Sequence, residues 1–101
     1  MKFLKWSDDK WLSKNSSILP YDKLEHLILG ALGMFIGIYW IGFSVLTSLI
    51  ILEILGIAWE IKDGLVPYNK KGNIEGFSWK DLIADNVGFL VGYLFGYLLS
   101  T

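Results

Sequence analysis

The feature that most constrains this chain is a long apolar stretch from Leu27 to Trp59, in which Glu53 is the only formally charged residue. A helix that crosses the hydrocarbon core of a bilayer needs about 20 apolar residues. The stretch is too long for one such helix and just long enough for two, so it predicts two membrane helices. A second stretch, from Leu82 to Leu99, is interrupted only by Asp85 and Asn86 and predicts a third.

The composition agrees with this prediction and narrows the class of protein. Of the 101 residues, 53% are hydrophobic, and the mean hydropathy is +0.47, well above that of a typical soluble domain. A very apolar soluble bundle is the alternative, but it would need polar helix faces that these stretches lack. The net charge of −1 and the absence of arginine argue against a nucleic-acid partner. We therefore expect one all-α domain, residues 1–101, built as an integral membrane bundle of three transmembrane helices.

Cap and turn signals divide the chain into five segments. Asp22 followed by Glu25 matches a helix N-cap with a carboxylate three residues later, and Ser78 followed by Asp81 repeats the pattern. The leader mixes lysines with tryptophans, so we expect it to lie on the membrane surface. The predicted segments are an interfacial leader at 1–20, helices at 22–40, 43–62 and 78–100, and a polar loop at 63–77.

The positions of the lysines predict the orientation in the membrane. All nine lie before or at the start of the first predicted helix, or flank the loop between the second and the third. Because positively charged residues are retained on the cytoplasmic side, we expect the N-terminus and this loop to be cytoplasmic. The protein is then predicted to be integral to the cytoplasmic (inner) membrane, with its C-terminus on the outer side.

Each predicted helix has one face on which polar groups are followed by small residues, at about 100° per residue. Glycine faces let helix backbones approach closely, which favours association between helices that lipid does not otherwise drive together. Such packing could occur within one chain or between copies in a homo-oligomer. The three faces comprise Asp22, His26, Gly30, Gly33 and Gly37; Glu53, Gly56, Glu60 and Asp63; and Asp81, Asp85, Gly88, Gly92 and Gly96.

The polar groups of these faces should lie at one membrane level, just inside the cytoplasmic boundary. A carboxylate at a helix centre costs on the order of 3 kcal/mol in a membrane, and grouped acids repel one another. They must therefore be protonated, paired with a cation, or bound to a metal ion. We predict catalytic roles for His26, Glu60 and Asp85, one on each helix. The residues predicted to bind a cofactor are Asp22, Lys23, Asp63, Lys80 and Asp81, and those predicted to ligate Mg²⁺, Mn²⁺ or Zn²⁺ are His26, Glu60, Asp81 and Asp85.

A structural interpretation of some of these residues is also open. Asp22 and Asp81 could be helix caps, where negative charge is favoured, and Asp63 could belong to a solvated rim with Lys62. Lys23 and the acids beside it would then cap and anchor the first helix, while His26 faces the shared acidic pocket. Glu53, two turns deeper, could be a protonated acid that bridges two helices.

The same residues carry a family resemblance. The segments DKLEH (22–26), WEIKDG (59–64) and GFSWKDLIADNVGFLVGY (76–93) resemble the signature of small YfiM-like envelope lipoproteins and, more loosely, that of VanZ-like membrane proteins. This chain has Trp59 where the pattern has lysine, and it has no cysteine that could carry a lipid. The resemblance implies a cell-envelope protein and no settled activity, although VanZ-like members are associated with glycopeptide resistance. The family positions are Asp22, Lys23, His26, Glu60, Asp63, Trp79, Lys80, Asp81, Asp85, Gly88 and Gly92.

Three functional hypotheses follow. The first is a metal-assisted hydrolase or phosphatase that acts on a lipid headgroup or a polyprenyl phosphate, because a histidine and carboxylates can transfer protons and bind a divalent cation. The second is a non-catalytic, VanZ-like membrane protein that binds a lipid or ligand, or forms a glycine-packed homo-oligomer. The third is a transporter or channel assembled from several copies, with Glu53 as a buried relay. Membrane lipid is the expected partner in the first two.

Overall fold

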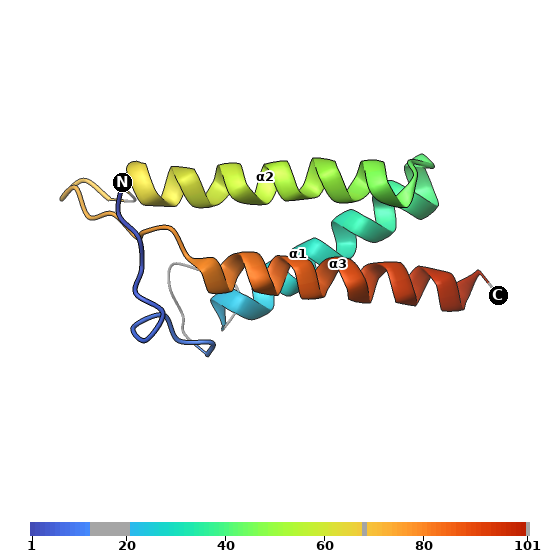
Figure 1. Ribbon diagram of the computed structural model, residues 1–101, viewed down its shortest axis with the longest axis horizontal. Coiled ribbons are helices and arrows are strands. Elements are labelled where there is room, and N and C mark those ends of the chain that lie inside the picture. Colours follow the sequence, from blue (N-terminus) through green and yellow to red (C-terminus); the bar gives the residue numbers. More distant parts are fainter. Residues whose placement is uncertain (13–20, 68, 101) are drawn as a thin grey trace.

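A computed structural model describes residues 1–12, 21–67 and 69–100. Its helical elements are α1 (Asp22–Phe35), η1 (Ile36–Ile41), α2 (Val45–Leu65) and α3 (Trp79–Leu99). They form an elongated bundle of 49 × 23 × 22 Å. α1 and α3 begin at one end of the bundle, the end at which α2 finishes, and the C-terminus lies at the other end (Figure 1). The all-α prediction is confirmed for the described residues.

The first helix differs from the single α-helix predicted over residues 22–40. The α-helical geometry ends at Phe35, and the chain continues as a π-helix through Ile41. Gly42 then adopts φ 93° and ends this helix, a left-handed conformation that glycine enters without a steric cost. Ser44 caps α2 by accepting a hydrogen bond from the Thr47 amide at 3.1 Å. The turn is therefore where the glycine and aromatic signals placed it, but it is approached through a wider helix.

The two predicted helix caps have different outcomes. Ser78 caps α3 by accepting a hydrogen bond from the Asp81 amide at 3.0 Å, so that prediction is confirmed. At α1, however, the capping position is Tyr21, whose side chain makes no capping bond. Asp22 is already helical, and its carboxylate turns inward, 3.3 Å from Lys23 Nζ and 3.8 Å from His26 Nε2. The prediction that Asp22 is an N-cap is wrong.

α1 and α3 pack through glycines. A Cβ added at Gly88 or Gly92 would collide with the backbone carbonyls of Leu27 or Ala31. A Cβ at Gly96 would collide with the ring of Tyr39, whose hydroxyl donates a hydrogen bond to the Tyr93 carbonyl at 2.8 Å. The glycine face of α3 is thus used within the chain, as backbone-to-backbone contact requires.

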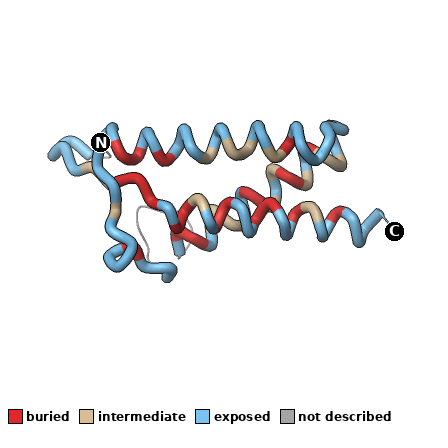
Figure 2. Tube along the Cα trace, in the orientation of Figure 1, coloured by how far each residue is buried: buried red, intermediate tan, exposed pale blue. Residues whose placement is uncertain are grey.

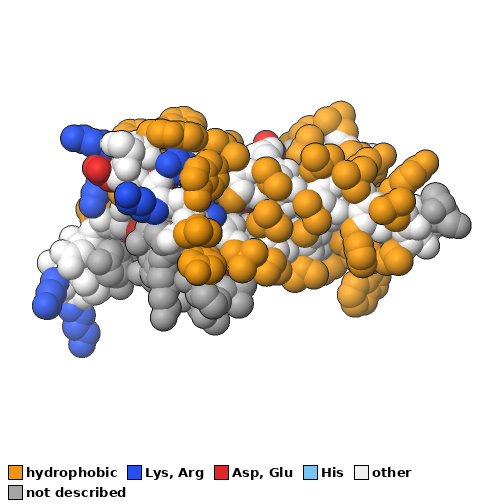
Figure 3. All heavy atoms as spheres, turned by 90° about the horizontal axis from the view of Figure 1, so that it is seen from below, with side chains coloured by type: hydrophobic (Ala, Val, Ile, Leu, Met, Phe, Trp, Pro, Cys, Tyr) orange, Lys and Arg blue, Asp and Glu red, His pale blue; other side chains and the backbone are white. Residues whose placement is uncertain are grey.

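The bundle is polar inside and apolar outside. The buried hydrophobic residues among those described are only Met34, Phe77, Ala84 and Phe89, whereas ten buried residues are polar or charged. Buried positions cluster where α1 and α3 meet and where α2 ends (Figure 2). Apolar side chains cover the part of the surface away from the lysine-bearing end (Figure 3). This distribution is the reverse of a soluble domain, which buries its large apolar side chains.

Within residues 1–12, 21–67 and 69–100, two helical segments are long and apolar enough to cross a membrane, rather than the three predicted. They are Asp22–Ile41 and Trp79–Leu99, each with a mean hydropathy of 1.6 over an 18-residue window. Every window of that length within α2 contains Glu53, Glu60 and Lys62. α2 therefore differs from the two candidate membrane helices in its number of charged residues, and not in a shortage of apolar ones.

The N-terminal segment crosses the polar end of the bundle. The Lys2 amide donates to the Gly64 carbonyl, the Leu4 amide to the Phe77 carbonyl, and the Phe77 amide to the Lys2 carbonyl, each at 2.9 Å. Residues 2–4 are therefore anchored to the end of α2 and to the segment before α3. Its predicted contact with a membrane surface stays a prediction, and residues 13–20 of the predicted leader lie outside the described residues.

Candidate functional site: a buried cluster of carboxylates, lysine and histidine

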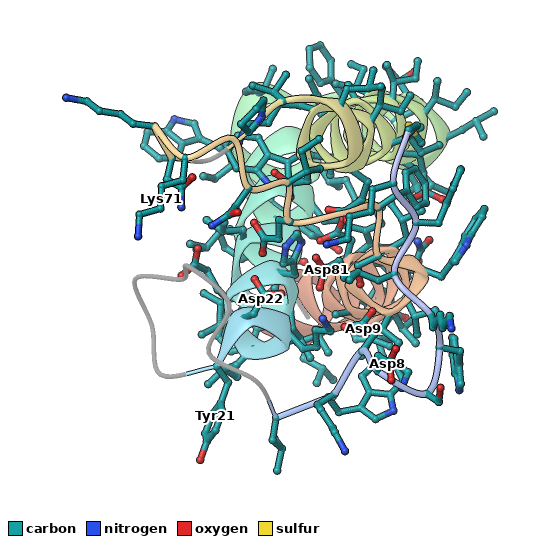
Figure 4. All side chains as sticks on the ribbon, turned by 90° about the vertical axis from the view of Figure 1, so that its left-hand side faces the viewer. Asp8, Asp9, Tyr21, Asp22, Lys71 and Asp81 are labelled. Atoms are coloured by element: carbon teal, nitrogen blue, oxygen red, sulfur yellow. The ribbon has the colours of Figure 1, made fainter. Side chains whose placement is uncertain are left out.

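Lys23 lies at the centre of a buried ion cluster at the polar end of the bundle. Its Nζ is 2.6 Å from Asp9 Oδ1, 2.8 Å from Asp81 Oδ1 and 3.3 Å from Asp22 Oδ2. The side chains of Lys23, Asp9 and Asp81 are each at most 5% exposed. Figure 4 looks onto this end and shows Asp22 and Asp81 facing one another between the helices, while Tyr21 points away. Lys23 is thus a buried counter-ion, as the pairing of grouped acids with a cation requires, and it anchors the start of α1 through ion pairs to Asp9 and Asp81.

His26 lies one turn further along α1 and contacts three carboxylates. Its Nδ1 is 2.7 Å from Asp85 Oδ1, and its Nε2 is 3.4 Å from Asp81 Oδ2 and 3.8 Å from Asp22 Oδ1. The predicted juxtaposition of His26 with Asp85 is therefore present, with Asp85 orienting the ring. Because His26 is 14% exposed, it is the most accessible of the groups in this contact network around Lys23.

Glu60 is the most deeply buried residue of the cluster. It is 0% exposed; its Oε1 accepts a hydrogen bond from the Ser78 amide at 2.9 Å, and its Oε2 has no hydrogen-bond partner among the residues that the structure describes. Single oxygens of Glu60, Asp63 and Asp81 lie within 4.8 Å of one another, as do ligand atoms of Asp22, His26 and Asp81. Asp81 belongs to both groups and joins them. The first group offers three carboxylate oxygens and the second offers two carboxylate oxygens and an imidazole nitrogen, and both are sets of atoms that a divalent cation takes as ligands.

The predicted catalytic residues are thus split between two adjoining groups. His26 and Asp85 lie on one side of Asp81, and Glu60 lies with Asp63 on the other. Asp22, Asp63 and Asp81 are only 6%, 6% and 3% exposed. The alternative that Asp63 belongs to a solvated rim is wrong because the N-terminal segment and the segment before α3 cover this end of the bundle.

Two glycines make room for Asp85. A Cβ at Gly56 of α2 would lie 2.9 Å from Asp85 Oδ2, and a Cβ at Gly30 of α1 would lie 2.7 Å from the Asp85 carbonyl oxygen. Any larger residue at either position would push α3 or its carboxylate away from His26. Part of the glycine pattern therefore positions the site as well as the helices.

An apolar groove of about 250 Å³ leads away from His26 and Asp85, between α1, α2 and α3. Its lining is mainly hydrocarbon and includes Gly30 and Gly56, with Glu25, His26 and Asp85 as its polar residues. The apolar side chains of the lining are those of Leu29, Leu52, Leu55, Trp59 and Phe89.

Glu53 lies apart from the cluster, on α2. Its Oε1 accepts a hydrogen bond from Asn86 Nδ2 of α3 at 3.0 Å, and Asn86 also donates to the Leu82 carbonyl at 2.8 Å. The contact matches the interpretation of Glu53 as a group that bridges two helices. It also places Glu53 on a different side of α3 from the cluster, not beneath it.

The N-terminal segment contributes residues that the sequence did not single out. Asp9, 3% exposed, pairs with Lys23 and accepts a hydrogen bond from the Ser78 hydroxyl. Lys80 donates to the backbone carbonyls of Trp6 and Asp9 at 2.9 and 2.5 Å and lies 4.5 Å from the ring of Trp6. No sequence signal marked Asp9, since it stands beside Asp8 in a charged, aperiodic segment. Ser78 was recognised only as a cap.

Negative charge is in excess within the buried cluster. Six of the buried residues in the described part of the chain are carboxylic acids, and two are lysines. With Lys62, which pairs with Asp63 at 3.2 Å, three lysines face six acids. Burial also raises the pKa of Glu75, and the nearby Asp63 and Asp81 raise it further. A bound dication would reduce the excess.

Comparison of the chain with protein-family models, with curated proteins and with solved structures gives no match. The resemblance to YfiM-like and VanZ-like proteins therefore stays a prediction. What the structure defines is an all-helical protein with two helices suited to a membrane and a buried cluster of carboxylates, lysine and histidine.

Proposed function

We propose that this is a membrane protein that holds a divalent cation between Glu60, Asp63 and Asp81 and hydrolyses a phosphate ester in a lipid headgroup. The observation that carries the proposal is the fully buried Glu60, one of whose oxygens has no hydrogen-bond partner in the described part of the chain although two other carboxylates lie close by. An unpaired buried carboxylate is costly. A cation at this point would satisfy it and remove the repulsion among the three acids.

The membrane setting is supported by the apolar exterior of the bundle. α1 with η1 and α3 have the length and hydropathy of membrane helices, and we propose that α2 is the third. The charged residues of α2 are compatible with this role because Glu53 bonds to Asn86 and Glu60 is enclosed by the other helices. From the positions of the lysines, we place the site on the cytoplasmic side of the inner membrane.

Oxygen ligands favour Mg²⁺ or Mn²⁺ over softer metals. The proposed ligand set keeps Glu60 and Asp81 from the sequence prediction and adds Asp63, whose oxygen lies in the same group. His26 and Asp85, predicted there as ligands, are instead held in their own hydrogen bond at 2.7 Å. When bound, the ion would supply polarisation of a phosphoryl oxygen.

The pair of His26 and Asp85 supplies proton transfer in this scheme. With the Nδ1 hydrogen donated to Asp85, Nε2 is the atom that accepts the proton of an attacking water. The water oxygen bonds to phosphorus and the bond from phosphorus to the lipid oxygen breaks. His26 then returns the proton to that oxygen, so that a lipid alcohol and inorganic phosphate are formed.

The groove supports a substrate with a long hydrocarbon chain. It is lined by His26, Asp85 and Glu25 and otherwise by apolar residues, and it lies between helices whose outer surfaces are also apolar. We assign it to one acyl or prenyl chain, with the phosphate at the polar end.

The test is a pair of measurements on the full chain in lipid nanodiscs. Calorimetric titration with Mn²⁺ is expected to give one site per chain, and Glu60→Gln should weaken binding at least tenfold because it removes a charged ligand. Phosphate release from phosphatidic acid or a polyprenyl phosphate should depend on Mn²⁺ and be lost in His26→Ala and Asp85→Asn.

Glu53→Gln is the matched control, since it removes a carboxylate from the same helix outside the cluster. It should bind Mn²⁺ as the unmodified chain does. Equal affinity in Glu60→Gln and Glu53→Gln would disprove the metal site. Metal binding without phosphate release would favour the non-catalytic alternative, a VanZ-like binding protein, which is consistent with the way the N-terminal segment covers the cluster.

A further inference from the structure

We propose that Lys23 and Ser78 form a binding site for a phosphate monoester group, and that the Asp9 carboxylate occupies this site until the phosphate displaces it. This inference rests on the proposed function, because it identifies the part of the same cluster that would receive the lipid phosphate. The site is built from buried groups: Lys23 is 5% exposed and Ser78 is 1% exposed.

The Asp9 carboxylate has the contacts expected of a bound oxyanion. One oxygen is 2.6 Å from Lys23 Nζ, and the other accepts the hydrogen bond of the Ser78 hydroxyl. Ser78 is the capping residue of α3, so the anion also lies at the positive end of a 21-residue helix. A phosphate oxygen can accept from the same ammonium and hydroxyl groups.

The segment that carries Asp9 is anchored at one end by backbone hydrogen bonds and is contacted beyond that anchor by side chains of α1 and α3. Residues 2–4 make three backbone hydrogen bonds to the end of α2 and the segment before α3. Residues 5–9 turn on themselves, with the amides of Asp8 and Asp9 both donating to the Lys5 carbonyl at 3.0 Å. Beyond the anchor, the turn is held chiefly by Asp9 and by the bonds from Lys80 to the carbonyls of Trp6 and Asp9.

Charge favours the exchange. A phosphate monoester carries about −1.5 to −2 charges near neutral pH, compared with −1 for Asp9. When the turn leaves, Lys80 loses its carbonyl partners and becomes a second cation beside Lys23. Asp22 and Asp81, which also contact Lys23, oppose an incoming anion. The cation proposed at Glu60, Asp63 and Asp81 offsets that repulsion.

The experiment measures phosphate binding to the full chain in nanodiscs with Mn²⁺ present, using inorganic phosphate in one arm and phosphatidic acid in the other. Asp9→Asn removes the competing charge and is expected to raise affinity for phosphate about tenfold. Asp8→Asn, a change of the same kind at the exposed neighbouring residue, should leave it unchanged. Ser78→Ala in the Asp9→Asn background should reverse the gain. Tighter binding of both ligands would identify a general phosphate site, and tighter binding of phosphatidic acid alone a lipid headgroup site.

The proposal is overturned if Asp9→Asn binds neither ligand more tightly than Asp8→Asn does. Hydrogen exchange on the unmodified chain gives an independent answer should Asp9→Asn fail to fold. Phosphatidic acid should speed exchange at the amides of Asp8 and Asp9 but not at Leu4 of the anchor, and no difference would overturn the proposal. A Mn²⁺ titration distinguishes failure of this proposal from failure of the proposed function. Metal binding at Glu60, Asp63 and Asp81 and the effect of Asp9→Asn on phosphate affinity are measured separately, so either result can be negative while the other is positive.

Discussion

Two parts of this bundle are stabilised by different kinds of contact, one by buried ion pairs and the other by close backbone packing at glycines. At the end where α1 and α3 begin, buried ion pairs join α1, α3 and the N-terminal segment around Lys23. Further along the same two helices, Gly88 and Gly92 bring backbones into direct contact with Leu27 and Ala31, with no ion pair between them. The glycine contact needs only shape, whereas the ion cluster needs every charge to keep its partner. The polar end should therefore be the more sensitive to single substitutions.

The largest effect is expected from Lys23→Met. The substitution removes the ammonium group that contacts Asp9, Asp22 and Asp81, so each of these three buried carboxylates loses its contact with Lys23. Removing one partner of a buried pair costs about 3–5 kcal/mol, so the free energy of unfolding should fall by about that amount. Unfolding in mixed micelles with increasing dodecyl sulfate, followed by circular dichroism, measures it.

Lys70→Met is the control for this substitution, since Lys70 is an exposed residue of the loop before α3. It should change the free energy of unfolding by less than about 0.5 kcal/mol. If Lys23→Met were equally mild, the ion cluster would contribute no more than a surface pair, and the contrast between the two ends would disappear.

Gly92→Leu tests the glycine contacts between α1 and α3 and should have the next largest effect. Even the first carbon of a side chain would collide with the Ala31 carbonyl, so α1 and α3 would have to separate. Overpacking typically costs about 1–3 kcal/mol, and we expect a value near the upper limit in the same unfolding assay. Leu90→Ala, at a position that is 58% exposed, should matter far less; if the two variants were equally stable, the glycine face would not be the packing face.

The contrast also explains what the sequence could predict. Glycine spacing is a periodic signal carried by each helix on its own, so the packing face of α3 follows from Gly88, Gly92 and Gly96. The inward direction of His26, Glu60 and Asp85 follows from the same periodicity. Their division into two groups does not, because it depends on how far Asp81 reaches between α1 and α2. Helical phase specifies a direction but not a distance.

Helical periodicity could not predict the role of Asp9, because Asp9 does not lie in a helix. Its position depends on backbone bonds between residues 2–4 and the segments at Gly64 and Phe77, which are remote in sequence. Asp22 shows the same limitation, because its spacing from Glu25 fits a cap equally well. Only the presence of Lys23 and His26 beside it, from the same helix, turns its carboxylate inward.

The smallest expected effect concerns α2, which the α1–α3 glycine contacts do not hold. Its link to α3 outside the cluster is the hydrogen bond from Asn86 to Glu53. Interhelical hydrogen bonds in membranes contribute about 0.6 kcal/mol on average. A double-mutant cycle with Glu53→Ala and Asn86→Ala should therefore give a coupling energy of about that size. The cycle is needed because Asn86 also donates to the Leu82 carbonyl, and that loss appears in the single variant but cancels in the coupling. A coupling energy indistinguishable from zero would mean that α2 is held only through Glu60 at the polar end and by apolar contacts along its length. α2 would then show the same contrast as α1 and α3, with polar contacts at the end that carries the ion cluster and apolar packing along the rest of its length.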